Sequence, residues 1–282
     1  MKVLVIDIGG THIKLASTDN PVPVKILSGP SMTAKQMVAD VLSTTADWQY
    51  EAISIGYPGP VTHDRPLAEP HNLASGWVGF PYQAALPKPV RFLNDAAMQA
   101  LGGYTGGKML FLGIGTGLGS ALIVDNVVVP LELAHLPYKN GRTYEEYIGL
   151  TGLERRGKKQ WRASVLDIVA RLRAAFVADY VVLGGGNAKL MRKLPDGVLL
   201  GANSNAIAGG FALWQKTAAS SPRPTLAPEI ARSVEATQNA LPPAQDQKPA
   251  EARHRKGGGG RKKKHGKPEK VTVPKHHKSR KK

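Results

Sequence analysis

Short apolar runs recur along the first two hundred residues and alternate with segments of helical spacing. The clearest runs are residues 3–6, 52–56, 90–93 and 180–183, and each leads directly into glycine or a polar residue. Runs of this length that end in such breakers are typical of buried strands. We therefore predict strands in these four places.

The remaining pattern completes an alternation of strands and helices. Two segments, 33–44 and 165–176, place apolar residues every three or four positions, as amphipathic helices do. Strands are also predicted at 15–16, 22–27, 108–112 and 121–129, and helices at 96–101, 143–150, 189–193 and 206–214.

Charge divides the chain into two unequal parts. Residues 221–282 contain 17 Lys and Arg against 5 Asp and Glu, out of a net charge of +17 for all 282 residues. Low hydrophobicity with excess like charge predicts disorder in this tail. The preceding 220 residues or so suffice for two small domains or one two-lobed domain.

Composition excludes several classes of site. The chain has no cysteine, so it has no disulfide, no thiolate zinc site and no cysteine nucleophile. Asp7 interrupts the first apolar run too early for a signal peptide, and no apolar run approaches the ~20 residues of a membrane span. We expect a soluble, cytoplasmic protein without membrane contact.

A carboxylate and a glycine-rich loop form the central candidate site. The strand at 90–93 leads to Asn94 and Asp95 at the start of a helix, where a carboxylate can simply be an N-cap. The loop Gly113–Gly119 follows, and five of its seven residues are Gly or Thr. Such a loop suits wrapping around phosphates, which leaves Asp95 to deprotonate a hydroxyl beside them.

The first strand ends in a second phosphate candidate, Asp7-Ile8-Gly9-Gly10-Thr11. Glycines let backbone N–H groups approach a phosphate, Thr11 can donate to its oxygen, and Asp7 can hold Mg²⁺ through water. The alternative is a plain hairpin with a Gly-Gly turn. Lys14 faces either the phosphates or solvent.

Three other places carry polar candidates. Glu132 and His135 lie three apart and would point the same way on a helical turn, where they suit a polyhydroxyl ligand or form a structural pair; the missing third Cys or His argues against zinc. In the loop at 71–77, Trp77 is expected to pack, whereas Asn72 is either a ligand contact or structural. Glycines 184–186 between a strand and a helix suggest a nucleotide or phosphate cradle.

The run Arg155–Lys159 concentrates positive charge before Trp161. Its simplest interpretation is a solvated helix start, and the alternative is contact with a polyanion.

Six motifs in this order resemble the ROK family, and more narrowly its polyphosphate glucokinase branch, over about residues 2–216. They are Asp7-Ile8-Gly9-Gly10-Thr11, Gly56-Tyr57-Pro58-Gly59, Asn94-Asp95-Ala96, Gly113–Gly119, Glu132-Leu133-Ala134-His135 and Leu183-Gly184-Gly185-Gly186.

The resemblance implies an α/β architecture, namely the actin-like, hexokinase-type, two-lobed ATPase fold with duplicated ribonuclease-H-like lobes. We expect an N-terminal lobe at 1–94, a C-terminal lobe at 95–220, and the disordered basic tail at 221–282.

The resemblance also assigns roles. Asp95 matches the base that accepts the proton of the sugar 6-hydroxyl. The implied sugar-binding residues are Asn94, Glu132, His135 and Glu145, and we add Gly59 and Asn72 as further candidates. The implied phosphate-binding residues are Gly9, Gly10, Thr11, Thr116, Gly117, Gly184 and Gly185. To these we add Asp7, Lys14 and Gly115 from their positions in the sequence, with Asp7 also holding Mg²⁺ through water.

The implied reaction is phosphorylation of glucose or a similar hexose with Mg²⁺ and without zinc, by a homodimer. The segment between His135 and Gly184 is short where adenine would rest, which favours polyphosphate over ATP as donor. The alternatives are an ATP-dependent hexose kinase and an inactive sugar-sensing regulator. In that regulator the tail binds nucleic acid; a basic tail with few aromatics is also suited to any polyanion.

Overall fold

We analysed a computed structural model, which describes residues 1–202 and 204–215. The predicted tail at 221–282 lies outside these residues. Within the described residues, no helix is both long enough and apolar enough to cross a membrane.

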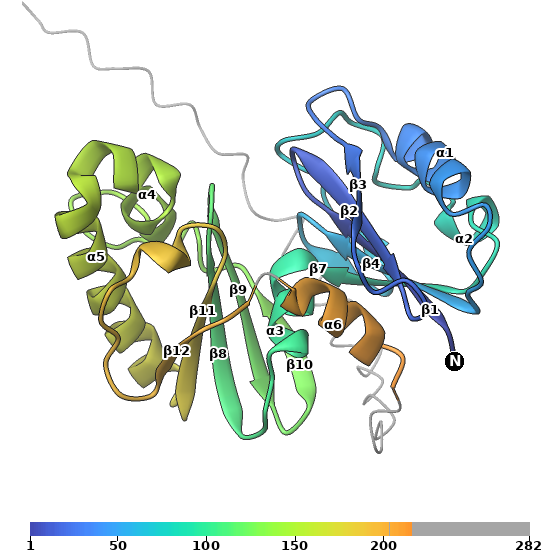
Figure 1. The fold of residues 1–282 in the computed structure, drawn as a ribbon. Coiled ribbons are helices and arrows are strands. Elements are labelled where there is room, and N and C mark those ends of the chain that lie inside the picture. The colour runs from blue at the N-terminus through green and yellow to red at the C-terminus, as the bar shows by residue number, and fades with distance from the viewer. Residues whose placement is uncertain (203, 216–282) are drawn as a thin grey trace, which may run out of the picture. The chain divides into compact units, whose positions relative to one another are not determined.

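The first sheet has five strands in the order β3-β2-β1-β4-β7 (Figure 1). Strands β1, β2 and β3 are antiparallel neighbours, whereas β4 and β7 continue the sheet in parallel with β1. Every residue of β1 and of β4 is buried, as their largely apolar sequences predict. The bounds are β1 (Val3–Ile8), β2 (His12–Ser17), β3 (Val24–Leu27), β4 (Ala52–Tyr57) and β7 (Val90–Asn94).

One face of this sheet packs on α1 (Ala34–Thr44) and α2 (Tyr82–Ala85). Thr33 caps α1 by accepting a hydrogen bond from the Gln36 N–H. Trp77 is fully buried in the same core, which confirms its predicted packing role.

The second sheet repeats the first. Its order is β10-β9-β8-β11-β12, again three antiparallel strands followed by two parallel ones. The repeated order confirms the predicted duplicated α/β lobe. The bounds are β8 (Lys108–Ile114), β9 (Leu118–Val124), β10 (Val127–Leu131), β11 (Tyr180–Gly184) and β12 (Val198–Leu200).

The second sheet packs on α5 (Leu150–Ala175), which follows α4 (Tyr144–Ile148) after one residue. Thr143 and Glu146 form a capping box that begins α4. The small elements are the hairpin of β5 (Val61–Thr62) and β6 (Arg65–Pro66), and the 3₁₀ turn η1 (Ala188–Leu190).

Two short helices, α3 (Asp95–Gly102) and α6 (Asn205–Ala212), lie against each other between the sheets (Figure 1). Small residues of α3 pack on the second sheet, while α6 packs on β1 of the first. Their backbones touch at Gly209, where an added Cβ would lie 1.8 Å from the Met98 carbonyl oxygen. Only glycine permits this crossing.

Four element predictions were wrong in detail. The segment 121–129 is two strands, because Asp125 and Asn126 form a turn with positive φ (48° and 68°). Strands β8 and β9 extend into Gly113–Gly119, which leaves a turn of only three residues. The helix expected at 165–176 begins at Leu150, with a break at Gly157 (φ 68°) that hides its periodicity. The helix expected at 189–193 is only η1, so a helix N-terminus cannot supply the cradle predicted there.

The lobe limits 1–94 and 95–220 stay a prediction. The strands of the two sheets do separate between β7 and β8, but α6 comes from the second range and packs on the first sheet.

Candidate active site

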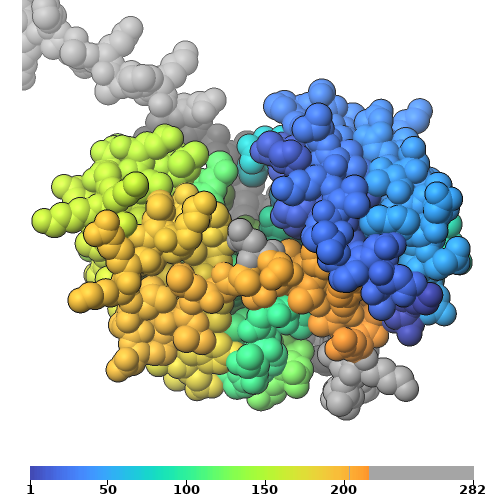
Figure 2. All heavy atoms as spheres, viewed as in Figure 1, coloured from blue at the N-terminus to red at the C-terminus, as the bar shows by residue number. Residues whose placement is uncertain are grey.

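A cleft of about 790 Å³ lies between the two sheets. Figure 2 shows the surface hollowed between the blue N-terminal part and the green and yellow C-terminal part. Every predicted site residue lines it except Thr11 and Gly184. Thr11 is exposed on the β1–β2 turn, while Gly184 is buried at the end of β11, where an added Cβ would lie 2.4 Å from Phe111. Gly184 is therefore a packing glycine, and its neighbour Gly185 reaches the cleft.

The sequence did not single out several further lining residues. His71 lies beside the predicted Asn72, while Gln99 lies one turn of α3 beyond Asp95. Thr151 completes the polar residues missed, whereas Gly186, which belongs to the predicted cradle at 184–186, also lines the cleft. Adjacency to a predicted site residue was the only available signal, and Thr151 lacked even that.

The β1–β2 turn is a tight hairpin, in which the Gly9 N–H donates to the His12 carbonyl at 3.1 Å. The plain-hairpin interpretation is thus correct in form, yet Gly9 and Gly10 also line the cleft. Asp7 is the penultimate residue of β1, with 8 % of its surface exposed, and its Oδ2 lies 2.7 Å from Lys14 Nζ. Lys14 therefore faces the cleft.

The residues around Asp7 fit a magnesium ion that binds together with a phosphate group. Within the described residues no three His, Asp or Glu side chains form a metal cage. Mg²⁺ in phosphoryl-transfer sites typically takes one or two carboxylates and fills its remaining positions with water and phosphate oxygens. Asp7, alone or with Asp95, supplies that number of carboxylates.

Asp95 is the first residue of α3, and its Oδ1 accepts a hydrogen bond from the Ala96 N–H at 2.7 Å. It is not the N-cap. That role belongs to Asn94, whose Oδ1 accepts from the Ala97 N–H at 3.1 Å. The N-cap alternative for Asp95 is therefore wrong, and its second carboxylate oxygen is left to face the cleft.

The pKa of Asp95 is raised to about 7, first by burial and then by the negative charge of Asp7. The Ala96 N–H and Lys14 act in the opposite direction. A carboxyl group with a pKa near neutrality is suited to accept a proton and release it again.

Both the oxygen and the nitrogen of the Asn94 side-chain amide form hydrogen bonds within the protein. Besides capping α3, its Nδ2 donates to the Gly59 carbonyl at 3.1 Å. The side chain thereby ties the turn at residues 58–60 to the start of α3, next to Asp95.

The glycine hairpin, residues Gly113–Gly119, places its turn of Gly115, Thr116 and Gly117 in the cleft. The Gly115 N–H donates to the Gly117 carbonyl at 3.1 Å, while Asn187 Nδ2 holds the Gly115 carbonyl at 2.9 Å. At the base, an added Cβ at Gly119 would lie 2.6 Å from the Cβ of Ala96. This close approach sets the hairpin beside Asp95.

Glu132 and His135 lie in a non-helical turn, closed by the Leu136 N–H donating to the Leu133 carbonyl at 3.2 Å. Both side chains nevertheless line the cleft. The pKa of Glu132 is raised, mainly by partial burial and also by Glu145, while His135 and His71 oppose the rise. His71 comes from the first lobe and the other three from the second, so this cluster draws on both sides of the cleft.

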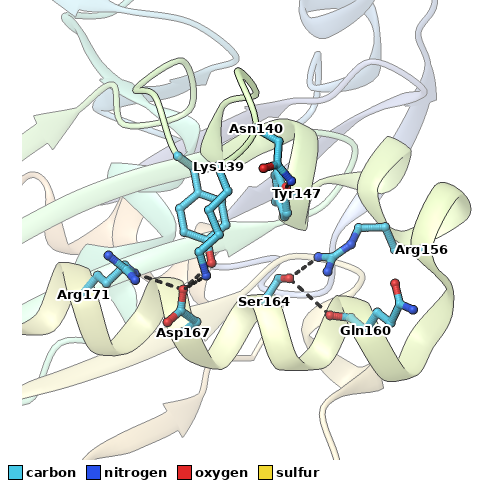
Figure 3. Close-up of polar contacts among 9 residues, drawn as sticks. Lys139, Asn140, Tyr147, Arg156, Gln160, Ser164, Asp167 and Arg171 are labelled. Carbon is cyan, nitrogen blue, oxygen red and sulfur yellow. Dashed lines mark hydrogen bonds and ion pairs between the residues drawn. The ribbon is translucent and has the colours of Figure 1, made fainter.

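Arg155–Lys159 does not line the cleft. It lies in the first part of α5 and so is part of a helix. The guanidinium groups of Arg155 and Arg156 lie 5.5 and 4.7 Å from the Tyr147 ring centre, and Arg156 also donates to Ser164 (Figure 3). Lys158 and Lys159 are exposed.

The model of the ROK family matches residues 3–130. The predicted resemblance to the ROK family is therefore confirmed. Polyphosphate glucokinase of Mycobacterium tuberculosis H37Rv is 25% identical over 203 residues, which span 64% of this chain and 76% of the relative. The corresponding figures for the Mycobacterium leprae enzyme are 25%, 64% and 62%.

Solved structures of ROK proteins share the fold. The inorganic polyphosphate/ATP-glucomannokinase from Arthrobacter sp. strain KM has a TM-score of 0.63 at 21% identity, over 75% of this chain and 98% of that one. The ROK hexokinase from Thermus thermophilus has a TM-score of 0.57 at 21% identity, with the same coverages. These likenesses confirm the predicted actin-like ATPase fold.

Proposed function

We propose that this chain is a sugar kinase that transfers a phosphoryl group to the 6-hydroxyl of glucose or a similar hexose. The observation that carries the proposal is the position of Asp95, a carboxylate with a raised pKa that lines the cleft and directly precedes Ala96, the residue that packs against the glycine hairpin. Phosphoryl transfer needs the acceptor hydroxyl and the phosphate held in line, with the spreading negative charge neutralised.

In this mechanism Asp95 accepts the proton of the attacking hydroxyl. A base of this kind contributes about 10²–10⁴-fold to the rate, and it works best when its pKa lies near the working pH. The hydrogen bond from the Ala96 N–H fixes one carboxylate oxygen and so orients the other toward the sugar.

Sugar hydroxyls are held by the polar cluster opposite Asp95. Glu132 and His135 are the first candidates, because their side chains lie in the cleft and have no hydrogen-bond or ion-pair partner among the described residues. Asn72 joins them from the first lobe, where its Cβ lies 3.2 Å from the Cβ position of Gly10. Relatives named as glucokinases support glucose as the acceptor.

The donor phosphates lie between the two glycine turns. Backbone N–H groups of residues 115–117 and 9–10 can approach phosphate oxygens closely because glycine has no side chain there. Lys14 adds a positive charge. Bound Mg²⁺, held through Asp7, would neutralise the charge that develops on the phosphate oxygens.

For the donor we propose inorganic polyphosphate, with ATP as the alternative. The relatives from M. tuberculosis and from M. leprae are both named polyphosphate glucokinase, and a polyphosphate/ATP-glucomannokinase shares the fold. Charge supports the same choice, because residues 138–173 contain 9 Lys and Arg against 4 Asp and Glu. Helix α5 begins beside the glycine hairpin, where the Leu150 N–H donates to the Thr116 carbonyl at 3.0 Å. The basic first part of α5 therefore starts next to the hairpin turn that we propose binds the donor phosphates.

The test is phosphorylation of glucose by the purified full chain with Mg²⁺ and either ATP or long-chain polyphosphate. A kcat/KM with polyphosphate well above that with ATP supports the proposal in full. A preference for ATP keeps the sugar kinase and rejects the donor. Absence of turnover with both donors, together with measurable glucose binding, rejects the kinase in favour of the sugar-sensing alternative. The homodimer, the cytoplasmic location and any contact of the tail with polyanions stay predictions.

A further inference from the structure

Glu145 makes a contact that a purely sugar-binding residue does not need. It lies in the first turn of α4, and its Oε2 accepts a hydrogen bond from the Leu118 N–H of the glycine hairpin at 2.9 Å. Next to it, an added Cβ on Gly117 would lie 2.3 Å from the same oxygen. The carboxylate therefore lies directly against the tip of the hairpin.

The backbone of α4 and of the residues that follow it forms hydrogen bonds with two neighbouring segments. The Glu145 N–H donates to the Ala134 carbonyl at 3.0 Å, within the segment that presents Glu132 and His135. A few residues later, the Leu150 N–H donates to the Thr116 carbonyl at 3.0 Å. Helix α4 is thus bonded to the sugar-binding segment on one side and to the hairpin turn on the other.

From these contacts we propose that Glu145 is a positioning residue that fixes the glycine hairpin relative to the sugar-binding segment. The inference rests on the proposed function. It differs from the role that the resemblance assigns, in which Glu145 only binds the sugar. Here Oε2 is committed to the hairpin, and Oε1 is the oxygen that remains for a sugar hydroxyl.

If Glu145 fixes the hairpin, it also sets the distance between the phosphoryl donor and the sugar. Loss of the acceptor leaves the Leu118 N–H without its partner and frees the tip to shift. Displacement of about 1 Å between reacting groups can cost about 10²-fold in rate. The loss should therefore appear in kcat even when glucose is saturating.

Three variants separate the roles. Glu145→Gln keeps an oxygen acceptor of the same reach, Glu145→Ala removes it, and Glu145→Asp keeps the charge but shortens the side chain by one methylene. Glu154→Ala is the matched control, because this exposed glutamate of α5 has no hydrogen bond or ion pair among the described residues.

Hydrogen exchange of the hairpin amides in the full chain is the first readout, since it needs no activity. We expect faster exchange at Leu118 in the Ala and Asp variants, and near wild-type exchange in the Gln variant and the Glu154→Ala control. We also expect kcat at saturating glucose to fall about 10- to 100-fold in the Ala and Asp variants, with a smaller loss for Gln.

Unchanged hairpin exchange in all three variants, with the whole effect in the KM for glucose, would overturn the inference and leave Glu145 as a sugar ligand. Should the Ala variant not fold, the Asp variant gives the same comparison. If the wild-type chain has no kinase activity, the proposed function fails while the exchange result still decides whether Glu145 holds the hairpin.

Discussion

Lys14 Nζ lies 2.7 Å from Asp7 Oδ2, and both side chains line the cleft together with Asp95. The two charges act on Asp95 in opposite directions, because Asp7 raises its pKa and Lys14 lowers it. The pair therefore tunes the pKa of the proposed base as well as lining the proposed phosphate site.

Removal of either charge should move the pKa of Asp95 in a predictable direction. Asp7→Asn removes the negative charge and so lowers that pKa from about 7, whereas Lys14→Met removes the positive charge and raises it. NMR titration of the Asp95 carboxyl without Mg²⁺ measures the shifts directly. In the pH profile of kcat/KM, the acid limb should move to higher pH in Lys14→Met.

Shifts in the same direction for the two variants would contradict this electrostatic account. Lys35→Met is a suitable control, because Lys35 is exposed on α1 and lies outside the cleft.

Asp95→Asn tests the base itself. Asn cannot accept the proton, but it has the same shape and can still accept the hydrogen bond from the Ala96 N–H. We expect kcat to fall about 10²–10⁴-fold, with the glucose Kd changed only a few-fold. Steady-state kinetics and calorimetric glucose binding measure both quantities, and near-normal turnover would remove Asp95 from the mechanism.

The same variant has a stability signature. The folded-state pKa of Asp95 lies above its ordinary value, so the folded chain holds this proton more tightly than the unfolded chain. The contribution of Asp95 to the free energy of unfolding therefore decreases as pH rises, until the pH passes about 7. Asp95→Asn should be stabilised relative to wild type at pH 8, by more than at pH 5, in denaturant unfolding. Equal differences at both pH values would mean that Asp95 has an ordinary pKa.

Most of the strands and the cleft residues could be predicted because they depend on local signals. Buried strands such as Val3–Ile8 are largely apolar, and each contains or leads to a glycine or carboxylate that lines the cleft. Local signals could not, however, distinguish the roles of two polar residues that are adjacent in the sequence. The sequence does not show that Asn94 rather than Asp95 caps α3, since either residue type suits that position.

Contacts between distant segments were also beyond the sequence. Nothing near Glu145 indicates that its carboxylate reaches Leu118, because only the folded lobe brings α4 to the hairpin. One missed signal was local: Asp125 and Asn126 favour the positive φ values of a tight hairpin, and this turn divides the apolar stretch 121–129.

Asn94 should contribute to stability through both of its hydrogen bonds. Asn94→Ala removes the cap of α3 and the bond to the Gly59 carbonyl, with an expected cost of about 1–2 kcal/mol in the free energy of unfolding. Asn94→Ser keeps a capping oxygen and loses only the amide donor, so its cost should be smaller. Denaturant unfolding of the two variants measures the difference, and equal losses would mean that the cap contributes nothing.

The crossing of α3 and α6 predicts that a better helix former will destabilise the chain. Alanine is favoured over glycine inside helices by about 1 kcal/mol, so Ala208→Gly on the exposed side of α6 should cost about that amount. Gly209→Ala reverses this exchange on the neighbouring residue, yet its Cβ would meet the Met98 carbonyl oxygen at 1.8 Å, and this oxygen belongs to a backbone that cannot rotate away. We expect a loss of about 2–3 kcal/mol in the free energy of unfolding, greater than that of Ala208→Gly. A neutral or stabilising Gly209→Ala would mean that the two helices separate easily, and the close crossing would then not be what holds the two sheets at either side of the cleft.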